Sequence, residues 1–402
     1  MSIFNSLGSN YSLTSAIKHL FTRGECKDYM KLEGYLDGRY DGSAYLFYKG
    51  REALRQSLLA TGLKKGSEVA INGFTCFVVD EAVTEAGFKS VYLDIDENQL
   101  HFTAETLRTA VKKNPKIKVV IIQNTLGYPC DIVGIEDVCK KSKLILIEDL
   151  AHSFGLIYPD GREAGTVGDM TMLSFGRDKV IDAVSGGALV IKGKVNSKWR
   201  ANLAEGRHQP KLKDRLLDRI YPLLTWKVRT FYSLGIGKAL QVTFKSIGLM
   251  PRAVADTLDG VTNLPSSNAK EINRLITEHD IRQQHRTEIA DIYRKIIPKS
   301  SIPAVAKKRI GESTELRFPV LTENREGLLT HLRADGVHIH DIWYDSPIAP
   351  PRYIDQTDYS GGLCKNSEAT TGLLMNLPTH RNISADQATK LAERIAEYGT
   401  KY

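Results

Sequence analysis

Short runs of β-branched and aliphatic residues alternate with amphipathic stretches between Gly50 and Lys192. Four runs are almost continuously apolar, which is typical of strands covered on both faces. They are EVAI (68–71), SVYLD (90–94), KVVII (118–122) and LILIED (144–149), and two more strands are expected near 170–175 and 187–192. The intervening stretches have helical spacing, as in 78–86 and in 103–113, where Thr103 is the expected N-cap. This alternation predicts an α/β fold, a mostly parallel central sheet with helices on both faces.

The length of 402 residues is enough for two or three structural units. We expect an N-terminal arm (1–45), a large domain (46–260) and a smaller C-terminal α/β domain (261–402). In the last of these, a helical pattern begins near residue 268 and a strand is expected at 316–321. Ser384 and Gln387 form a capping box at the start of a C-terminal helix.

The composition is that of a globular protein, with 42% apolar and 25% charged residues. It excludes a collagen, a disordered chain and a small disulfide-built fold. None of the five cysteines stands in a zinc-binding spacing, so we expect reduced thiols and no metal site. The first residues lack the pattern of a signal peptide, and the apolar runs are too short to span a bilayer, so a cytoplasmic protein is expected.

Asp149 ends a strand that should be central in the sheet, and His152 follows three residues later. Open α/β sheets bind ligands at the carboxyl ends of their strands. A carboxylate there can accept a hydrogen bond from a protonated ring nitrogen or hold a metal ion. The alternative is an aspartate that merely caps the next turn.

Lys179 follows the strand expected at 170–175, and Ser174 stands five residues before it. A partly desolvated lysine has a lowered pKa and can form a Schiff base, whereas most lysines are simply solvated amines. Gly50, in KGREAL (49–54), opens an amphipathic helix whose free N–H groups suit a phosphate. An ordinary helix start is the alternative for that glycine.

Together these residues supply a phosphate cradle, a carboxylate for a ring nitrogen and an amine for an aldehyde. Pyridoxal 5′-phosphate (PLP) needs these three groups. Each signal is weak alone, but their joint occurrence in one β-α-β framework predicts a PLP site.

The sequence resembles the DegT/DnrJ/EryC1/StrS aminotransferases, a family of fold-type I PLP-dependent transferases. The most specific matching blocks are LIEDLAHSFG (146–155) and GTVGDMTMLSFGRDK (165–179). They are supported by KGREAL, LKKGSEVAINGFTC (63–76), VYLDID (91–96), IIQNTLGYPCDI (121–132), SGGALV (185–190) and NLPTH (376–380). The resemblance implies that Lys179 is the Schiff-base lysine and that Asp149 pairs with the pyridine nitrogen. It places His152 against the cofactor ring, and Ser174 with the backbone of Gly50 and Arg51 on the phosphate.

Two positions depart from the family pattern. Cys76, followed by Phe77, stands where the family commonly has an aromatic residue stacked on the cofactor. The segment by which a partner subunit reaches the phosphate lacks its arginine in TNLPSSNAK (262–270), which leaves Asn263 or Asn268 for that role. By the same resemblance, residues lining the acceptor pocket are His338, His340, Trp343, Tyr344 and His380, although packing in the small domain would explain them equally well.

The resemblance implies transfer of an amino group, with glutamate as donor, to a nucleotide-linked keto-sugar. Such a reaction belongs to cell-surface polysaccharide, lipopolysaccharide or deoxyaminosugar biosynthesis, and the family implies a homodimer. Two alternatives stay open. One is another fold-type I reaction, such as decarboxylation, aldol cleavage or desulfuration. The other is a PLP-binding regulatory protein without turnover.

The segment 211–250 carries eight lysines and arginines against two aspartates, interleaved with aromatic residues. Three interpretations stay open: helices with a solvated basic face, a docking surface for an anionic substrate, and an amphipathic element that touches an anionic membrane surface. Nucleic-acid binding is not expected, because no recognition motif accompanies the charge.

Overall fold

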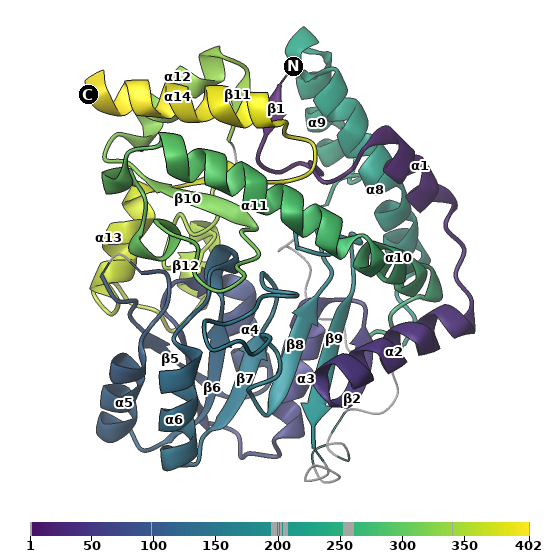
Figure 1. Cartoon of the computed structure of the whole chain (residues 1–402). Helices are drawn as coiled ribbons and strands as arrows, with labels where there is room; N and C mark the ends of the chain where they lie inside the picture. Colours follow the sequence, from purple (N-terminus) through teal and green to yellow (C-terminus); the bar gives the residue numbers. More distant parts are fainter. Residues whose placement is uncertain are drawn as a thin grey trace.

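A seven-stranded sheet with helices on both faces forms the larger part of the molecule (Figure 1). The computed structural model describes residues 2–401 apart from 98, 194–198, 200, 202, 204–207, 252–260 and 340. Along the sheet the strand order is β2-β9-β8-β7-β6-β3-β5. The strands are β2 (Gly42–Phe47), β3 (Glu68–Asn72), β5 (Lys89–Leu93), β6 (Ile117–Gln123), β7 (Ile145–Asp149), β8 (Met170–Ser174) and β9 (Gly187–Lys192).

Only β9 runs against the others, because it pairs antiparallel with both β8 and β2. The pairs β3–β5, β3–β6, β6–β7 and β7–β8 are parallel. The predicted, mostly parallel sheet is therefore confirmed, and the six expected strands lie within a residue or two of their predicted bounds. The edge strand β2 was not predicted.

Alternate residues of each central strand pack into two separate cores, one on each face of the sheet. On one face, Ala70, Val120 and Leu146 pack with α2 (Cys26–Tyr40), α5 (Ala104–Lys113), α6 (Ile132–Ser142) and α10 (Ser266–Thr277). On the other, Val69, Ile121 and Ile147 pack with α3 (Gly50–Ala60) and α4 (Phe77–Glu85). The nearly continuous apolar runs are explained by this double burial. The expected N-cap is present, since Thr103 Oγ1 accepts the Thr106 N–H at 3.3 Å.

The C-terminal part has its own apolar core beside the carboxyl ends of the sheet strands (Figure 1). Its central pair, β10 (Arg317–Leu321) and β13 (Leu374–Pro378), is antiparallel. Around it lie α11 (His279–Ile296), α12 (Arg325–Ala334), β11 (Val337–His338), α13 (Lys365–Leu373) and α14 (Ala385–Lys401). The expected capping box holds the start of α14: the Ser384 N–H donates to Gln387 Oε1 at 2.9 Å and the Gln387 N–H to Ser384 Oγ at 3.2 Å.

The N-terminal residues connect the two parts. β1 (Ile3–Phe4) pairs in parallel with β11, α1 (Leu13–Phe21) packs on α8 (Leu212–Thr230), and α2 packs on the sheet. The expected boundary between 45 and 46 falls inside β2. The expected boundary at 261 precedes α10, which packs in the core of the sheet. The division of the chain into an arm and two domains stays a prediction.

The basic aromatic segment folds into α8 and α9 (Ile236–Ser246), joined by a short 3₁₀ turn (Tyr232–Leu234). Tyr221 is buried, but Phe231 is 39% exposed, so the aromatic residues are only partly in a core. Among the described residues, none of the helices combines the length and the apolarity needed to cross a bilayer.

Candidate active site

Two neighbouring parallel strands end at the same edge of the sheet, and each ends in a polar residue. Asp149 is the last residue of β7 and Ser174 the last of β8. Asp149 is 5% exposed, and its Oδ1 accepts the Ala151 N–H at 2.8 Å. Burial raises the pKa of Asp149 to about 6, although that backbone hydrogen bond and the nearby Lys179 act in the opposite direction. This carboxyl group therefore lines the cavity from a poorly solvated position.

Lys179 lies in the loop that follows β8 and points back toward β7. Its Nζ is 3.1 Å from His152 Nε2 and 4.7 Å from the centre of the Trp343 ring. Removal from water lowers the pKa of Lys179. The preceding residue, Asp178, has a positive φ of 60°, and its N–H donates to Asp182 Oδ2 at 2.9 Å. A lysine with a lowered pKa has more of the unprotonated amine that attacks an aldehyde.

His152 is held in a defined orientation by two contacts besides Lys179. Its ring is stacked on Trp343, with 4.8 Å between the ring centres and 18° between the planes. Its Nδ1 accepts the Leu126 N–H at 3.2 Å. Burial, followed by Lys179 and Arg317, lowers the pKa of His152 well below its usual value, so the ring is neutral. Because Nδ1 is an acceptor, the ring proton is on Nε2 and is directed at an unprotonated Lys179 amine.

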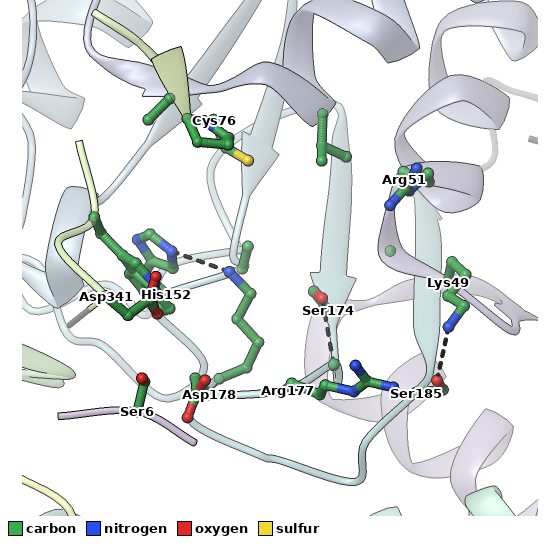
Figure 2. A pocket seen from close by; sticks show the side chains of 18 of the residues that line it. Ser6, Lys49, Arg51, Cys76, His152, Ser174, Arg177, Asp178, Ser185 and Asp341 are labelled. Carbon is green, nitrogen blue, oxygen red and sulfur yellow. Dashed lines mark hydrogen bonds between the residues drawn. The ribbon is translucent and has the colours of Figure 1, made fainter. Parts of the chain in front are cut away.

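A narrow cradle lies between the start of α3 and the end of β8. A Cβ atom at Gly50 would lie 2.8 Å from Ser174 Oγ, and one at Gly187 would lie 2.5 Å from the Lys49 carbonyl oxygen. The first N–H groups of α3 are not capped by the Lys49 side chain, and the positive end of the helix dipole is there. This arrangement suits a phosphate group, and PLP carries one. Figure 2 shows Ser174, Arg51 and Lys49 on the same side of the pocket.

The groups described so far line one cavity of about 680 Å³. Its positive side chains are Lys49, Arg51, Arg177, Lys179, Lys245 and Arg352, and its acidic ones are Asp149, Asp178, Asp341 and Asp345. Among the described residues the fold thus brings together Lys179, Asp149, His152, Ser174, Gly50, Arg51 and Cys76. A cavity of this size accommodates a cofactor together with part of a substrate.

The two positions that departed from the family pattern behave differently. Cys76 lines the cavity and is half-buried, and burial raises the pKa of its thiol. Phe77 instead stacks on Tyr353, with 4.8 Å between the ring centres. Asn263 does not line the cavity of its own chain. Its N–H donates to the His208 carbonyl at 2.8 Å, and its reach into a partner subunit stays a prediction.

The residues expected in the acceptor pocket divide into two groups, and His340 lies outside the described residues. Trp343 and Tyr344 line the cavity. His338 and His380 instead contact Phe4 of β1: His338 stacks on its ring at 4.9 Å, and His380 Nε2 lies 2.7 Å from its carbonyl oxygen.

Several lining residues were not singled out from the sequence. They are Ser6, Leu7, Gln123, Arg177, Asp178, Gln241 and Asp341. Gln123 ends β6, so its place beside Asp149 could have been inferred from the same strand-end argument. Ser6 and Leu7 had no such signal, because the arm is placed by contacts between residues far apart in the chain, such as its pairing with β11 and the Asn5 hydrogen bond to the Asp341 carbonyl.

Fold and site define the class of protein, a PLP-dependent aminotransferase. The chain belongs to the DegT/DnrJ/EryC1/StrS aminotransferase family, whose profile matches residues 43–219 and 264–396. The resemblance inferred from the sequence motifs is thereby confirmed.

The chain is similar along most of its length to characterised relatives. It is 31% identical to the GDP-perosamine synthase of Vibrio cholerae and 26% identical to that of Escherichia coli O157:H7, each over 87% of this chain and 84% of the relative. Its fold is similar to that of PseC of Helicobacter pylori, an aminotransferase of pseudaminic acid biosynthesis, with a TM-score of 0.73, 16% identity and all of both chains covered.

Proposed function

We propose that this protein transfers an amino group from an amino acid, glutamate, to a keto-sugar linked to a nucleotide, using PLP bound at Lys179. The observation that carries the proposal is the convergence of three groups on one cavity. These are the Lys179 amine, the buried Asp149 carboxyl group and the cradle between Gly50 and Ser174. Relatives named GDP-perosamine synthase support a nucleotide-sugar as the substrate.

When bound, the cofactor supplies an aldehyde and an electron-accepting pyridine ring. In the proposal, Lys179 would hold the aldehyde group, and its Nζ amine would move a proton at the reacting carbon of the substrate. Asp149 accepts a hydrogen bond from the ring nitrogen and keeps it protonated. Ser174 and the N–H groups at Gly50 and Arg51 bind the phosphate.

His152 and Trp343 form the wall behind the Lys179 amine. We infer that the neutral His152 orients the amine through Nε2 while excluding water from one side of the cavity. At the mouth, Lys245 and Arg352 are exposed cations that line the same cavity. We infer that they bind the diphosphate of the sugar nucleotide, because a phosphate there is favoured by both charge and solvent access.

The direct test is a screen of GDP-, UDP- and dTDP-linked 3-keto and 4-keto sugars with glutamate, in which aminated products are detected by mass spectrometry. Formation of an amino sugar together with 2-oxoglutarate supports the proposal. If the holoprotein converts none of them, the acceptor assignment is rejected.

The rival functions give different outcomes with glutamate alone. An aminotransferase releases 2-oxoglutarate and leaves the cofactor in its amine form, in stoichiometric amount. A decarboxylase releases carbon dioxide instead. A regulatory protein without turnover binds the amino acid and releases neither product.

We further infer a homodimer working in the cytoplasm, in the synthesis of a cell-surface polysaccharide or lipopolysaccharide. Support comes from the family resemblance, in which Asn263 or Asn268 of a partner subunit would approach the phosphate. Mass measurement of the holoprotein in solution tests the dimer. An Asn263→Ala variant that keeps the dimer but loses cofactor affinity would assign the crossing residue.

A further inference from the structure

The helix pair α8–α9 exposes large apolar side chains that no described part of the chain covers. Ile236 is 54% exposed, Val242 62% and Ile247, directly after α9, 61%. Leu234, in the turn that precedes α9, is 68% exposed. Only Gly237 of α9 is fully buried. A single exposed leucine needs no explanation, but four such residues within fourteen positions indicate a surface that has a partner.

The same helix pair is positively charged beyond Asp218. Between 219 and 251 the chain has no aspartate or glutamate, whereas Lys227, Lys238 and Lys245 are exposed. Of the two aspartates of α8, Asp218 is buried and faces Tyr48 and Arg177 rather than solvent, and Asp214 lies in the first turn of the helix. Lys238 and Lys245 are seven residues apart and therefore share one face of α9 with Val242, whereas Ile236 lies about half a turn away from them.

The helix α1, which packs on α8, continues this character. Leu13, Ile17 and Phe21 are 39%, 44% and 73% exposed, and their spacing of four residues places them in one stripe. Figure 1 shows α1, α8 and α9 together at the upper right, away from the sheet. α1 also has no acidic residue.

The family comparison separates this surface from the shared scaffold. The family profile matches up to residue 219 and resumes at 264, so most of α8 and all of α9 lie outside it. Lys179, Asp149, Ser174 and Gly50 all lie in the matched part of the chain.

We propose that the outer face of α9 and the turn before it dock on an anionic lipid surface. Apolar side chains rimmed by lysines and free of acids are complementary to acyl chains below negative headgroups. A second copy of the chain is the less favourable occupant. In a two-fold symmetric contact, the same lysines would meet one another without any carboxylate to offset the repulsion. Gln241 and Lys245 of α9 also line the catalytic cavity, so docking brings the mouth of that cavity to the lipid surface.

The test is sedimentation of the full-length holoprotein with vesicles of phosphatidylcholine alone and with vesicles containing 30 mol% phosphatidylglycerol. The expected result is binding to the anionic vesicles that weakens at high salt. The triple variant Ile236→Ser, Val242→Ser, Ile247→Ser should bind at least about tenfold more weakly. The double variant Lys227→Gln, Lys238→Gln should lower the partition about 25-fold, since each lysine contributes about a factor of five.

Matched controls come from other surfaces. Ile281→Ser on α11, at a residue 76% exposed, and Lys112→Gln with Lys113→Gln on α5 should leave vesicle binding unchanged. The molecular mass of each variant in solution and its aminotransfer activity are also measured, so that unfolding is detected. Wild-type protein that stays in the supernatant with both vesicles overturns the proposal. So does a triple variant that binds as the wild type does. A change of oligomeric state in that variant, without any vesicle binding by the wild type, would identify the face as a contact between copies.

Discussion

Lys179 Nζ and His152 Nε2 lie 3.1 Å apart, and the two residues come from loops that follow neighbouring strands β8 and β7. His152 is neutral because burial lowers its pKa, and its Nδ1 is already an acceptor. The proton on Nε2 therefore favours the unprotonated amine at Lys179. Hence the lysine is prepared for reaction with an aldehyde before any cofactor arrives.

Replacing Lys179 with alanine should remove covalent attachment of the cofactor and lower turnover by a factor of about 10³ or more, since the amine is both anchor and proton carrier. Borohydride reduction of wild-type holoprotein followed by peptide mapping should label residue 179. The matched control, Lys113→Ala on the exposed face of α5, should retain label and activity. Recovery of the label at another lysine would reject the assignment.

Replacing Asp149 with asparagine should slow aminotransfer by roughly 10²–10⁴, because an amide cannot keep the ring nitrogen protonated. Cofactor binding should be partly retained. Single-turnover rates with glutamate measure the effect, and Asp137→Asn on the surface of α6 is the control. An unchanged rate would mean that another group protonates the ring nitrogen.

The same substitution should stabilise the cofactor-free protein at neutral pH. Asp149 has a folded pKa of about 6 against 3.8 for the ordinary carboxyl group, so the folded state binds more protons between these values. Stability is therefore lost as pH rises from about 4 to 6, and asparagine removes this loss, worth on the order of 2–3 kcal/mol. Urea unfolding of both proteins at pH 4 and pH 7 measures it. A gain of equal size at both pH values would contradict this origin.

Gly50→Ala should weaken cofactor binding about 10–100-fold, because the added methyl group would lie 2.8 Å from Ser174 Oγ, where the phosphate is proposed to bind. Titration of the cofactor-free protein with PLP measures the dissociation constant. Gly34→Ala is the matched control. It lies on exposed α2 with no heavy atom within 4 Å of the new methyl group, and should leave binding unchanged while stabilising the helix slightly. Equal affinities in both variants would exclude the cradle.

The sequence allowed the sheet to be predicted because its central strands are apolar on both faces, as in Ile145–Asp149. The edge strand β2 was missed, since its pairing with β9 joins residues about 145 positions apart and leaves no local pattern. Asp149, Ser174 and Lys179 could be predicted as site residues because they end or follow neighbouring strands of one parallel sheet.

Other parts of the site had no local signal. Trp343 could be named only by resemblance, and its stacking on His152 depends on how the C-terminal part packs against the sheet. The sequence shows that α9 contains basic and apolar residues. Which of them face solvent is set by the packing of α9 on α8 and could not be predicted from the sequence.

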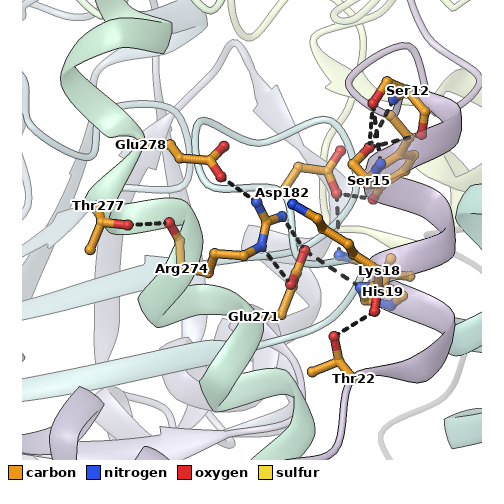
Figure 3. Close-up of polar contacts among 12 residues, drawn as sticks. Ser12, Ser15, Lys18, His19, Thr22, Asp182, Glu271, Arg274, Thr277 and Glu278 are labelled. Atoms are coloured by element: carbon orange, nitrogen blue, oxygen red, sulfur yellow. Dashed lines mark hydrogen bonds and ion pairs between the residues drawn. The ribbon is translucent and has the colours of Figure 1, made fainter.

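The N-terminal arm is held by a buried carboxylate, which gives the last prediction. Glu271 of α10 is 4% exposed, accepts two hydrogen bonds from Arg274 at 2.6 and 3.0 Å, and lies 3.8 Å from His19 of α1 (Figure 3). Burial alone would raise the pKa of Glu271, but the nearby His19 and the hydrogen bonds from Arg274 outweigh it and lower the pKa to about 2. This carboxylate stabilises the fold above its ordinary pKa of 4.5, and the contribution is lost as pH falls toward 2.

Glu271→Gln should therefore destabilise the protein by about 2–3 kcal/mol at pH 7 and by roughly half as much or less at pH 3. Because Glu271 contacts His19 of the arm, the variant should also expose the arm to protease. Urea unfolding at the two pH values and limited proteolysis near Arg23 measure both effects. Glu393→Gln on the exposed side of α14 is the control and should change neither. If the variant is equally destabilised at pH 3 and pH 7, the ion pair is not the source, and packing of α1 on α8 holds the arm by itself.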